Sequence, residues 1–211
     1  MIRILLAEDH ETVREGLRML LNSQPDLTVV AEAGDGDNAV EKARALKPDV
    51  VVLDLTMPKM SGLTAAKTLR DSEPSIKLVA LTRHDDQAYV REMLAIGASA
   101  YVLKQSPSTE LLTAVRAAAA GASHLDPALG EVDSISSRRR ATVPSITARE
   151  QEVLRHVAVG LTNKEIAALL DVSVKTVEVH KANAMRKLNL KGRVDVVRYA
   201  VLNGWLQDPG P

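Results

Sequence analysis

Acidic side chains follow two apolar stretches of the sequence, at the point where each stretch ends. Glu8 and Asp9 come directly after residues 2–7, and Asp54 closes the apolar run at residues 50–53, three of which are β-branched. A carboxylate at the end of a buried strand is poorly hydrated, and it is unfavourable unless a cation or a hydrogen-bond donor attends it. Three carboxylates in one crevice repel one another, so a hard divalent cation such as Mg²⁺ is the counter-ion that they favour.

These residues predict a magnesium site with oxygen ligands. Asp9, Asp54 and the main-chain oxygen of Thr56 would bind the ion directly, and Glu8 would reach it through water. Pro58 follows soon after and prevents a continued central strand, so Asp54 is expected at the carboxyl end of its strand. Open α/β sheets bind their ligands at that end.

The same residues have the chemistry for phosphoryl transfer. A carboxylate oxygen of Asp54 can act as a nucleophile toward phosphorus and form an acyl phosphate. Thr82 and Lys104 stand at the ends of two further apolar runs. Phosphoryl transfer depends mostly on positioning and on charge neutralisation. We therefore expect the ammonium group of Lys104 to neutralise charge and the hydroxyl of Thr82 to donate to a phosphoryl oxygen.

The elements that would position these side chains alternate between strand and helix. Strands are predicted at residues 2–7, 27–33, 50–55, 77–82 and 100–104. Helices are predicted at residues 12–22, 62–70 and 85–96, with two more begun by Asp37 and by Ser106, the last ending at Gly121. The Asp37 helix would bury Val40, Ala43 and Leu46. Five such units predict an α/β doubly wound parallel five-stranded sheet of the flavodoxin type. The strand order 2-1-3-4-5 is taken from known sheets of that type. The first and third strands are then neighbours.

The helical periodicity stops between residues 122 and 145. Pro, Gly, Ser and Asp are frequent there, which predicts a linker between a first domain at 1–121 and a second at 146–211. The segment includes the basic run Arg138–Arg140. This run is interpreted as part of a solvated tether, and the alternative is a contact with a nucleic-acid backbone.

The second domain has the pattern of four helices. Thr147 and Thr162 each precede a glutamate by three residues, the signature of a capping box. The helices are expected at about 148–159, 163–170, 174–188 and 193–203, the last with Val194, Val197 and Val201 facing inward. A short helix, a three-residue turn and a longer helix predict a small all-α helix-turn-helix domain.

The second helix of such a pair lies in the major groove of DNA. The polar side of residues 174–188 is therefore a candidate DNA-binding surface, with Ser173 and Thr176 placed to hold a phosphate at the helix start. The alternative is a four-helix packing unit whose polar face only meets water. The candidate DNA contacts are Lys164, Ser173, Lys175, Thr176, Glu178, Val179, Lys181, Ala182 and Arg186.

The composition restricts the remaining possibilities. The chain has no cysteine, which excludes disulfides and thiolate chemistry, and no apolar run long enough to cross a membrane. We expect a cytoplasmic protein without membrane contact. Residues 1–125 contain 14 basic and 17 acidic side chains, whereas residues 146–211 contain 10 and 7, so only the second part is mildly basic. One Trp, three Tyr and no Phe argue against base stacking on single strands.

Glu8-Asp9, Asp54, Thr82 and Lys104, with Tyr101 three residues before the lysine, resemble the receiver domain of two-component response regulators. The resemblance implies that a sensor histidine kinase phosphorylates Asp54, and that Thr82 and Tyr101 move together as a switch. The sequence departs from many receivers at two positions. Gln105 follows the lysine where proline is frequent, and Arg83 follows the threonine where a small residue is frequent.

The motifs at residues 146–150, 160–167 and 173–181 together resemble a LuxR-type DNA-binding domain. A receiver followed by this domain is similar to the NarL/FixJ family. The resemblance implies a homodimer when phosphorylated, binding to inverted half-sites of double-stranded DNA, and pairing of protomers through the fourth helix. Glu178 stands where relatives often carry a basic residue. A carboxylate there can accept a hydrogen bond from cytosine.

The preferred interpretation is a response regulator transcription factor, controlled by magnesium-dependent phosphorylation of Asp54. It would not be an enzyme beyond its own phosphorylation and dephosphorylation. One alternative is a magnesium-dependent phosphohydrolase with Asp54 as nucleophile, although Thr56 stands where a second carboxylate would be the general acid. The other is a DNA-binding protein that is independent of phosphorylation and uses its first domain only to dimerise.

Overall fold

The computed structural model describes residues 1–83, 87–129, 146–188, 190–203 and 205–206. The chain divides into two compact units, Met1–Ile135 and Ser136–Pro211. Each unit has its own hydrophobic core and is described by itself. Within the described residues, no helix is long and apolar enough to span a membrane.

A parallel sheet forms the centre of the first unit. Its strands follow the order β2-β1-β3-β4-β5-β6, so the predicted order of the first five is confirmed. All five residues of β3 are buried, as expected for a strand covered on both faces. The strands are β1 (Ile2–Ala7), β2 (Leu27–Ala33), β3 (Val50–Asp54), β4 (Lys77–Thr82), β5 (Ala100–Leu103) and β6 (His124–Leu125).

Strand β6 lies inside the segment that the sequence analysis interpreted as a linker. It pairs with β5 through Ala100↔His124 and Tyr101↔Leu125, and a 3₁₀ turn at Pro127–Leu129 follows it. A strand of two residues has no periodicity of its own, so the sequence carried no signal for it.

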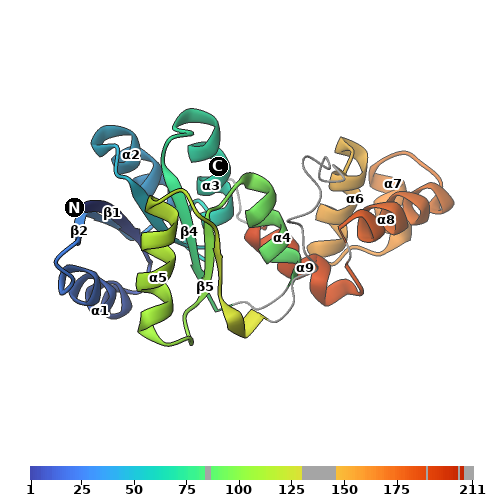
Figure 1. Cartoon of the computed structure of the whole chain (residues 1–211). Coiled ribbons are helices and arrows are strands. Elements are labelled where there is room, and N and C mark those ends of the chain that lie inside the picture. The colour runs from blue at the N-terminus through green and yellow to red at the C-terminus, as the bar shows by residue number, and fades with distance from the viewer. Residues whose placement is uncertain (84–86, 130–145, 189, 204, 207–211) are drawn as a thin grey trace. The chain divides into compact units, whose positions relative to one another are not determined.

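Helices cover both faces of the sheet (Figure 1). Alternate strand residues, such as Ile4, Val52 and Val102, pack with α1 and α5 in one apolar cluster. Helices α2, α3 and α4 lie beside one another on the opposite face. The bounds are α1 (Glu11–Asn22), α2 (Gly36–Leu46), α3 (Gly62–Ser72), α4 (Gln87–Ile96) and α5 (Ser108–Ala119). The predicted start of the fourth helix at residue 85 lies outside the described residues.

Two predicted helix starts are wrong. Helix α2 is capped by Asp35, whose Oδ1 accepts from the amide of Asn38 at 2.8 Å, and not by Asp37. Helix α5 has Pro107 at its N-cap without a side-chain hydrogen bond, and not Ser106. The hydroxyl of Ser106 instead bonds the carboxylate of Asp126, a partner far along the chain. Local spacing alone does not identify the N-cap residue, because each polar candidate offers a side-chain oxygen that can accept from a helix amide.

The predicted burial on α2 is partly wrong. Val40 and Ala43 are buried as expected, but Leu46 is exposed at the last position of the helix. Lys47 follows in a left-handed conformation with φ of 45°, which ends the helix there.

The described part of the second unit forms four helices around a small apolar core. Both predicted capping boxes are present, at Thr147 with Glu150 and at Thr162 with Glu165. Asp171, with φ of 50°, makes the tight turn between the second and third helices, and Ser173 caps the third. The helices are α6 (Ala148–Ala158), α7 (Asn163–Leu169), α8 (Val174–Lys187) and α9 (Arg193–Leu202).

The inward face predicted for α9 is wrong for Val194 and Val201, whereas Val197 is partly buried. Val196, Tyr199 and Ala200 are buried, whereas Val194 is 68% exposed and Val201 is 46% exposed. Both triplets fit a helical period, because the helix carries apolar residues around much of its circumference. On the face that is buried, Tyr199 packs against Trp205, with 5.2 Å between the ring centroids. An apolar stripe with Val194 and Val201 is left on the surface of this unit.

Candidate functional site

Asp54 lies at the carboxyl end of β3, with its side chain almost fully buried. The loop after Asp54 folds back onto the end of β3, where the amide of Gly62 donates to the main-chain oxygen of Leu55 at 3.1 Å. A Cβ atom at Gly62 would overlap the main-chain oxygen of Asp54. Glycine at the start of α3 therefore sets the position of the acidic strand end, a role that the sequence analysis missed.

Lys104 connects the carboxylates of two strands. Its Nζ lies 2.7 Å from Oδ2 of Asp54 and 2.6 Å from Oε2 of Glu8. Glu8 is fully buried, and the lysine side chain is only 11% exposed. The order of the sheet explains this meeting, since β1, β3, β4 and β5 end at one edge. The fold thus brings together the predicted residues Glu8, Asp54 and Lys104.

Burial raises the pKa of Asp54 above its ordinary value. The ammonium group of Lys104 and the amide of Thr56, which donates to Oδ1 at 3.1 Å, act in the opposite direction without overcoming it. The negative charge of Glu8 adds to the rise. The ionised carboxylate is therefore less favourable here than in water, and a further cation would stabilise it.

The acidic edge of the sheet, at Glu8, Asp9 and Asp54, has the chemistry of a site for a hard divalent cation. Ligand atoms of Glu8, Asp9 and His10 all lie within 4.8 Å of one another. Glu8 and Asp54 contact the ammonium group of Lys104, whereas Oδ1 of Asp9 lies 2.8 Å from Nδ1 of His10. The three carboxylates and the ammonium group together carry a formal charge of −2. Mg²⁺ carries the complementary charge and prefers such oxygen ligands. The residues present thus fit the expected ion, with Thr56 close enough in sequence to offer its main-chain oxygen.

Thr82 and Tyr101, the predicted switch residues, are both fully buried. The main-chain oxygen of Thr82 accepts from the amide of Lys104 at 2.7 Å, which links the end of β4 to the lysine. Arg14, which the sequence analysis missed, donates from α1 to the main-chain oxygen of Glu8 at 2.7 Å. An arginine in the first turn of the helix that follows the acidic pair was the available signal.

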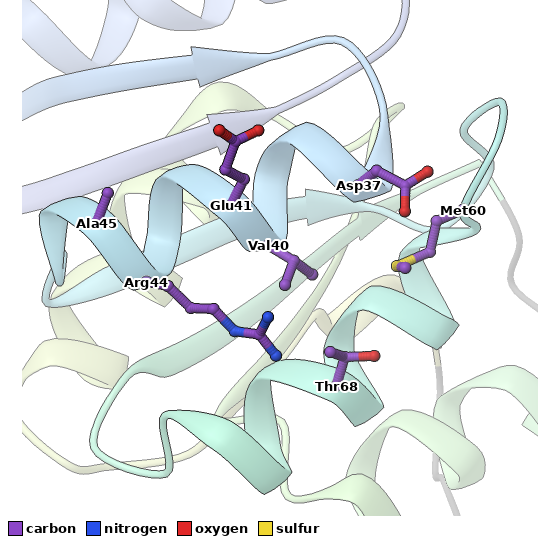
Figure 2. Close-up of a pocket in the computed structure, with 7 residues that line it drawn as sticks. All are labelled: Asp37, Val40, Glu41, Arg44, Ala45, Met60 and Thr68. Atoms are coloured by element: carbon purple, nitrogen blue, oxygen red, sulfur yellow. The ribbon is translucent and has the colours of Figure 1, made fainter.

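A pocket between α2 and α3 is separate from this site (Figure 2). Its walls come from the two helices and from Met60, which precedes α3. Glu8, Asp9 and Asp54 do not line it, and its polar side chains are mixed in charge. The lining residues are Asp37, Val40, Glu41, Arg44, Ala45, Met60 and Thr68.

The second candidate site is the outer surface of α8. Val177 and Ala184 are buried, which fixes the opposite side of the helix toward solvent. Lys164 lies on α7, and the other predicted contact residues lie on that outer side of α8 or at its margin. Lys164, Ser173, Lys175, Glu178, Val179, Ala182 and Arg186 are exposed, and Thr176 and Lys181 are partly buried. Ser173 accepts from the amide of Thr176 at 3.0 Å and so caps the helix.

Two residues of the first motif in this unit hold α8 in place. Arg149 donates to the main-chain oxygen of Leu170, at the end of α7, at 2.8 Å. Glu150 is buried and forms an ion pair with Lys187, with 2.7 Å between Oε2 and Nζ. Helix α6 thus holds the helix-turn-helix pair at the turn and at the end of α8, and these residues have a structural role.

Glu150→Gln is expected to destabilise the second unit by about 2 kcal/mol, because it weakens a capping box and breaks the pair with Lys187. The hydrogen bond from Lys187 is the main reason that the pKa of Glu150 is lowered below its ordinary value of 4.5. A lowered pKa gives stability that is present above the ordinary value and is lost as the pH falls through the folded-state value. Urea unfolding followed by Trp205 fluorescence measures the difference, which should shrink in acid. Glu152→Gln, at the more exposed pair with Arg149, is the control and should have a smaller effect.

Comparison with known proteins agrees with this division of the chain. Residues 4–116 match the response regulator receiver domain, and residues 144–200 match the luxR family of bacterial regulatory proteins. The acidic sheet edge and the helix-turn-helix unit thus define a response regulator. More particularly, the chain belongs to the NarL/FixJ family of two-component response regulators.

Relatives match along nearly the whole chain. The oxygen regulatory protein NreC of Staphylococcus epidermidis is 42% identical over 212 residues, which cover 95% of this chain and 97% of that protein. NreC of Staphylococcus aureus is 42% identical over 210 residues, with the same coverage. These relatives agree with a regulator and not with the phosphohydrolase alternative.

Solved structures of this family resemble the fold. RcsB from Salmonella enterica serovar Typhimurium, bound to promoter P1flhDC in the presence of the phosphomimetic BeF₃⁻, has a TM-score of 0.76 and 28% identity. That match covers 95% of this chain and 98% of RcsB. ChrA, a response regulator of a heme-sensing two-component system, has a TM-score of 0.53 and 34% identity, covering 97% of this chain and 98% of ChrA.

Proposed function

We propose that this response regulator is a cytoplasmic transcription factor whose binding to DNA is controlled by phosphorylation of Asp54. The observation that carries the proposal is the contact of Lys104 with both Glu8 and Asp54 at the edge of the sheet. The domain bounds remain those of the sequence analysis, a receiver at 1–121 and a DNA-binding domain at 146–211. The segment 122–145 that joins them begins with strand β6.

The phosphoryl donor is a phosphohistidine of a sensor kinase. An oxygen of Asp54 attacks the phosphorus, the bond from phosphorus to the histidine nitrogen breaks, and an acyl phosphate forms. Lys104 moves from the carboxylate to the new phosphoryl oxygens, and the Thr82 hydroxyl donates to one of them. Mg²⁺, held by Asp9, Asp54, the main-chain oxygen of Thr56 and, through water, Glu8, supplies charge neutralisation when it is bound.

The outer side of α8 reads DNA in the major groove. Lys175 and Arg186 supply positive charge to the DNA phosphates. Ser173 and Thr176 place the positive N-terminal end of the helix next to a phosphate. Val179 is 48% exposed and suits contact with a thymine methyl group. Glu178 accepts from cytosine.

Phosphorylated protomers pair as a dimer on inverted half-sites. The exposed valines of α9, Val194 and Val201, support this role, because an apolar stripe on a surface helix is stabilised by a partner. A two-fold axis between protomers would give half-sites of opposite orientation.

Beryllofluoride, which mimics a phosphoryl group on aspartate, tests the proposed control. The DNA probe is a duplex that the wild-type protein selects from a random pool. Affinity for this duplex should rise at least about tenfold when beryllofluoride and Mg²⁺ are added together, a coupling of about 1.4 kcal/mol. Equal affinity with and without the mimic would favour the alternative of a regulator independent of phosphorylation.

Thr82→Ala is expected to separate phosphorylation from its consequence. The variant should still accept a phosphoryl group from acetyl phosphate, because Asp54 and Lys104 remain, but it should lose most of the gain in DNA affinity. Labelling and DNA titration are measured on the same samples. Thr113→Ala, at an exposed threonine on α5, is the control. A Thr82→Ala protein with the full gain would contradict the switch role.

A further inference from the structure

The residues after α5 are tied to β5, the strand that ends just before Lys104. The amide of His124 donates to the oxygen of Ser99, and the amide of Asp126 donates to the oxygen of Tyr101, both at 3.0 Å. Strand β6 then stops, because the next amide that would face β5, that of Ala128, donates to the side chain of Asp126 instead. The segment that leads toward the second unit therefore begins in direct contact with a predicted switch residue.

The side chain of Asp126 continues the ladder where the main chain cannot. Its carboxylate is buried, with the residue only 2% exposed. Oδ2 accepts from the amide of Leu103 at 3.0 Å, and Oδ1 accepts from the amide of Ala128 at 2.9 Å. Ser106 donates its hydroxyl to the same carboxylate. Asp126 thus binds residues on both sides of Lys104 in the sequence.

The charge state of Asp126 agrees with this arrangement. Burial by itself acts to raise the pKa of Asp126, but the hydrogen bonds from Ser106, Leu103 and Ala128 outweigh it and hold the pKa below its ordinary value. The carboxylate is therefore ionised, and each of its oxygens remains a strong acceptor.

The end of β5 is consequently fixed from two directions. The amide of Leu103 is held by Asp126, and the next amide, that of Lys104, is held by the oxygen of Thr82 at 2.7 Å. With its main chain held in this way, the lysine side chain reaches between Glu8 and Asp54. Loss of the Asp126 contact would leave the buried amide of Leu103 unpaired and would free the strand end to shift.

We propose that Asp126 is a positioning residue for Lys104, which links the segment after β6 to the phosphoryl-accepting site. The inference rests on the proposed function of Asp54. A change in the position of Lys104 on phosphorylation would be felt at Asp126, and through it at the start of the segment that leads to the DNA-binding domain.

The test uses the full chain and measures two affinities by calorimetry, for Mg²⁺ alone and for beryllofluoride in saturating Mg²⁺. Asp126→Ala should weaken beryllofluoride binding about tenfold, the size expected for a misplaced charge-assisted hydrogen bond. Its affinity for Mg²⁺ alone should change by less than about twofold, because the carboxylate ligands are untouched. Asp126→Asn keeps the size of the side chain and one acceptor oxygen, so its loss of beryllofluoride affinity should be smaller. This variant serves as the test if the alanine variant does not fold.

A double-mutant cycle shows whether the effect passes through Lys104. In a Lys104→Ala background, Asp126→Ala should add no further loss of beryllofluoride affinity. Additive losses would overturn the inference, as would unchanged affinity in both single variants of Asp126.

Glu110→Gln is the matched control for β6. It removes the pair between Glu110 and His124, at 3.0 Å, without touching the end of β5. Beryllofluoride affinity should stay at the wild-type level in this variant. An equal loss there, or a parallel loss of Mg²⁺ affinity in Asp126→Ala, would indicate general loosening and overturn the inference. Failure of the wild-type protein to bind beryllofluoride would instead overturn the proposed role of Asp54, and this inference with it.

Discussion

Asp54→Asn is expected to abolish phosphorylation by acetyl phosphate in the presence of Mg²⁺, a decrease of at least about 100-fold. The amide has nearly the shape of the carboxylate, but its oxygen is a poor nucleophile and it removes one of the negative charges that hold the metal. Burial raises the pKa of Asp54 and makes its negative charge unfavourable, and asparagine removes that charge, so the variant should remain folded. Phosphate-affinity electrophoresis measures the modified fraction.

The control for this prediction is Asp71→Asn, which changes an exposed aspartate at the end of α3 in the same unit. It should be labelled at the wild-type rate. Full labelling of Asp54→Asn would place the acceptor elsewhere and would remove the basis of the proposed control.

Ala182→Glu is expected to weaken binding to the selected duplex by at least about 100-fold, since bringing like charges together costs several kcal/mol. Ala182 is exposed on the outer side of α8, one turn from Glu178 and Val179. A carboxylate there would enter the groove between two phosphate backbones. Because the native side chain is not part of the core, stability should change little. Fluorescence anisotropy of a labelled duplex measures the affinity.

Ala148→Glu is the matched control, with the same substitution at an exposed position. Ala148 is the first residue of α6, where a glutamate also suits the helix dipole. Its DNA affinity should stay near that of the wild type. Should Ala182→Glu bind as tightly as Ala148→Glu, the outer side of α8 would not be the surface that meets DNA.

Much of the site was predictable from the sequence, because its residues mark the ends of buried strands. A buried run such as residues 50–53 has little choice of structure, and the alternation of strands and helices leaves few topologies. Once the order is 2-1-3-4-5, Asp54, Thr82 and Lys104 must end at one edge of the sheet. The capping boxes at Thr147 and Thr162 were equally predictable, because their partners are three residues away.

The errors occurred where local patterns were ambiguous. Asp35 and Asp37 both offer a capping oxygen to α2, and only the packed structure selects Asp35. On α9, two sets of apolar residues fit the same period, and the aromatic contact of Tyr199 with Trp205 accompanies burial of the other set. Neither the N-cap of α2 nor the buried face of α9 is determined by the residues of a single helical turn.

The sequence by itself therefore determined the two kinds of domain, the alternation of strands and helices and the chemical types at the acidic edge, because each depends on short-range spacing. Tertiary structure alone decided that Lys104 joins Glu8 to Asp54, that Gly62 approaches the main chain of Asp54, and that Asp126 holds the end of β5. These contacts join residues that lie far apart in the chain or depend on a close approach of two backbones. Packing of the whole sheet, and not local preference, brings them together.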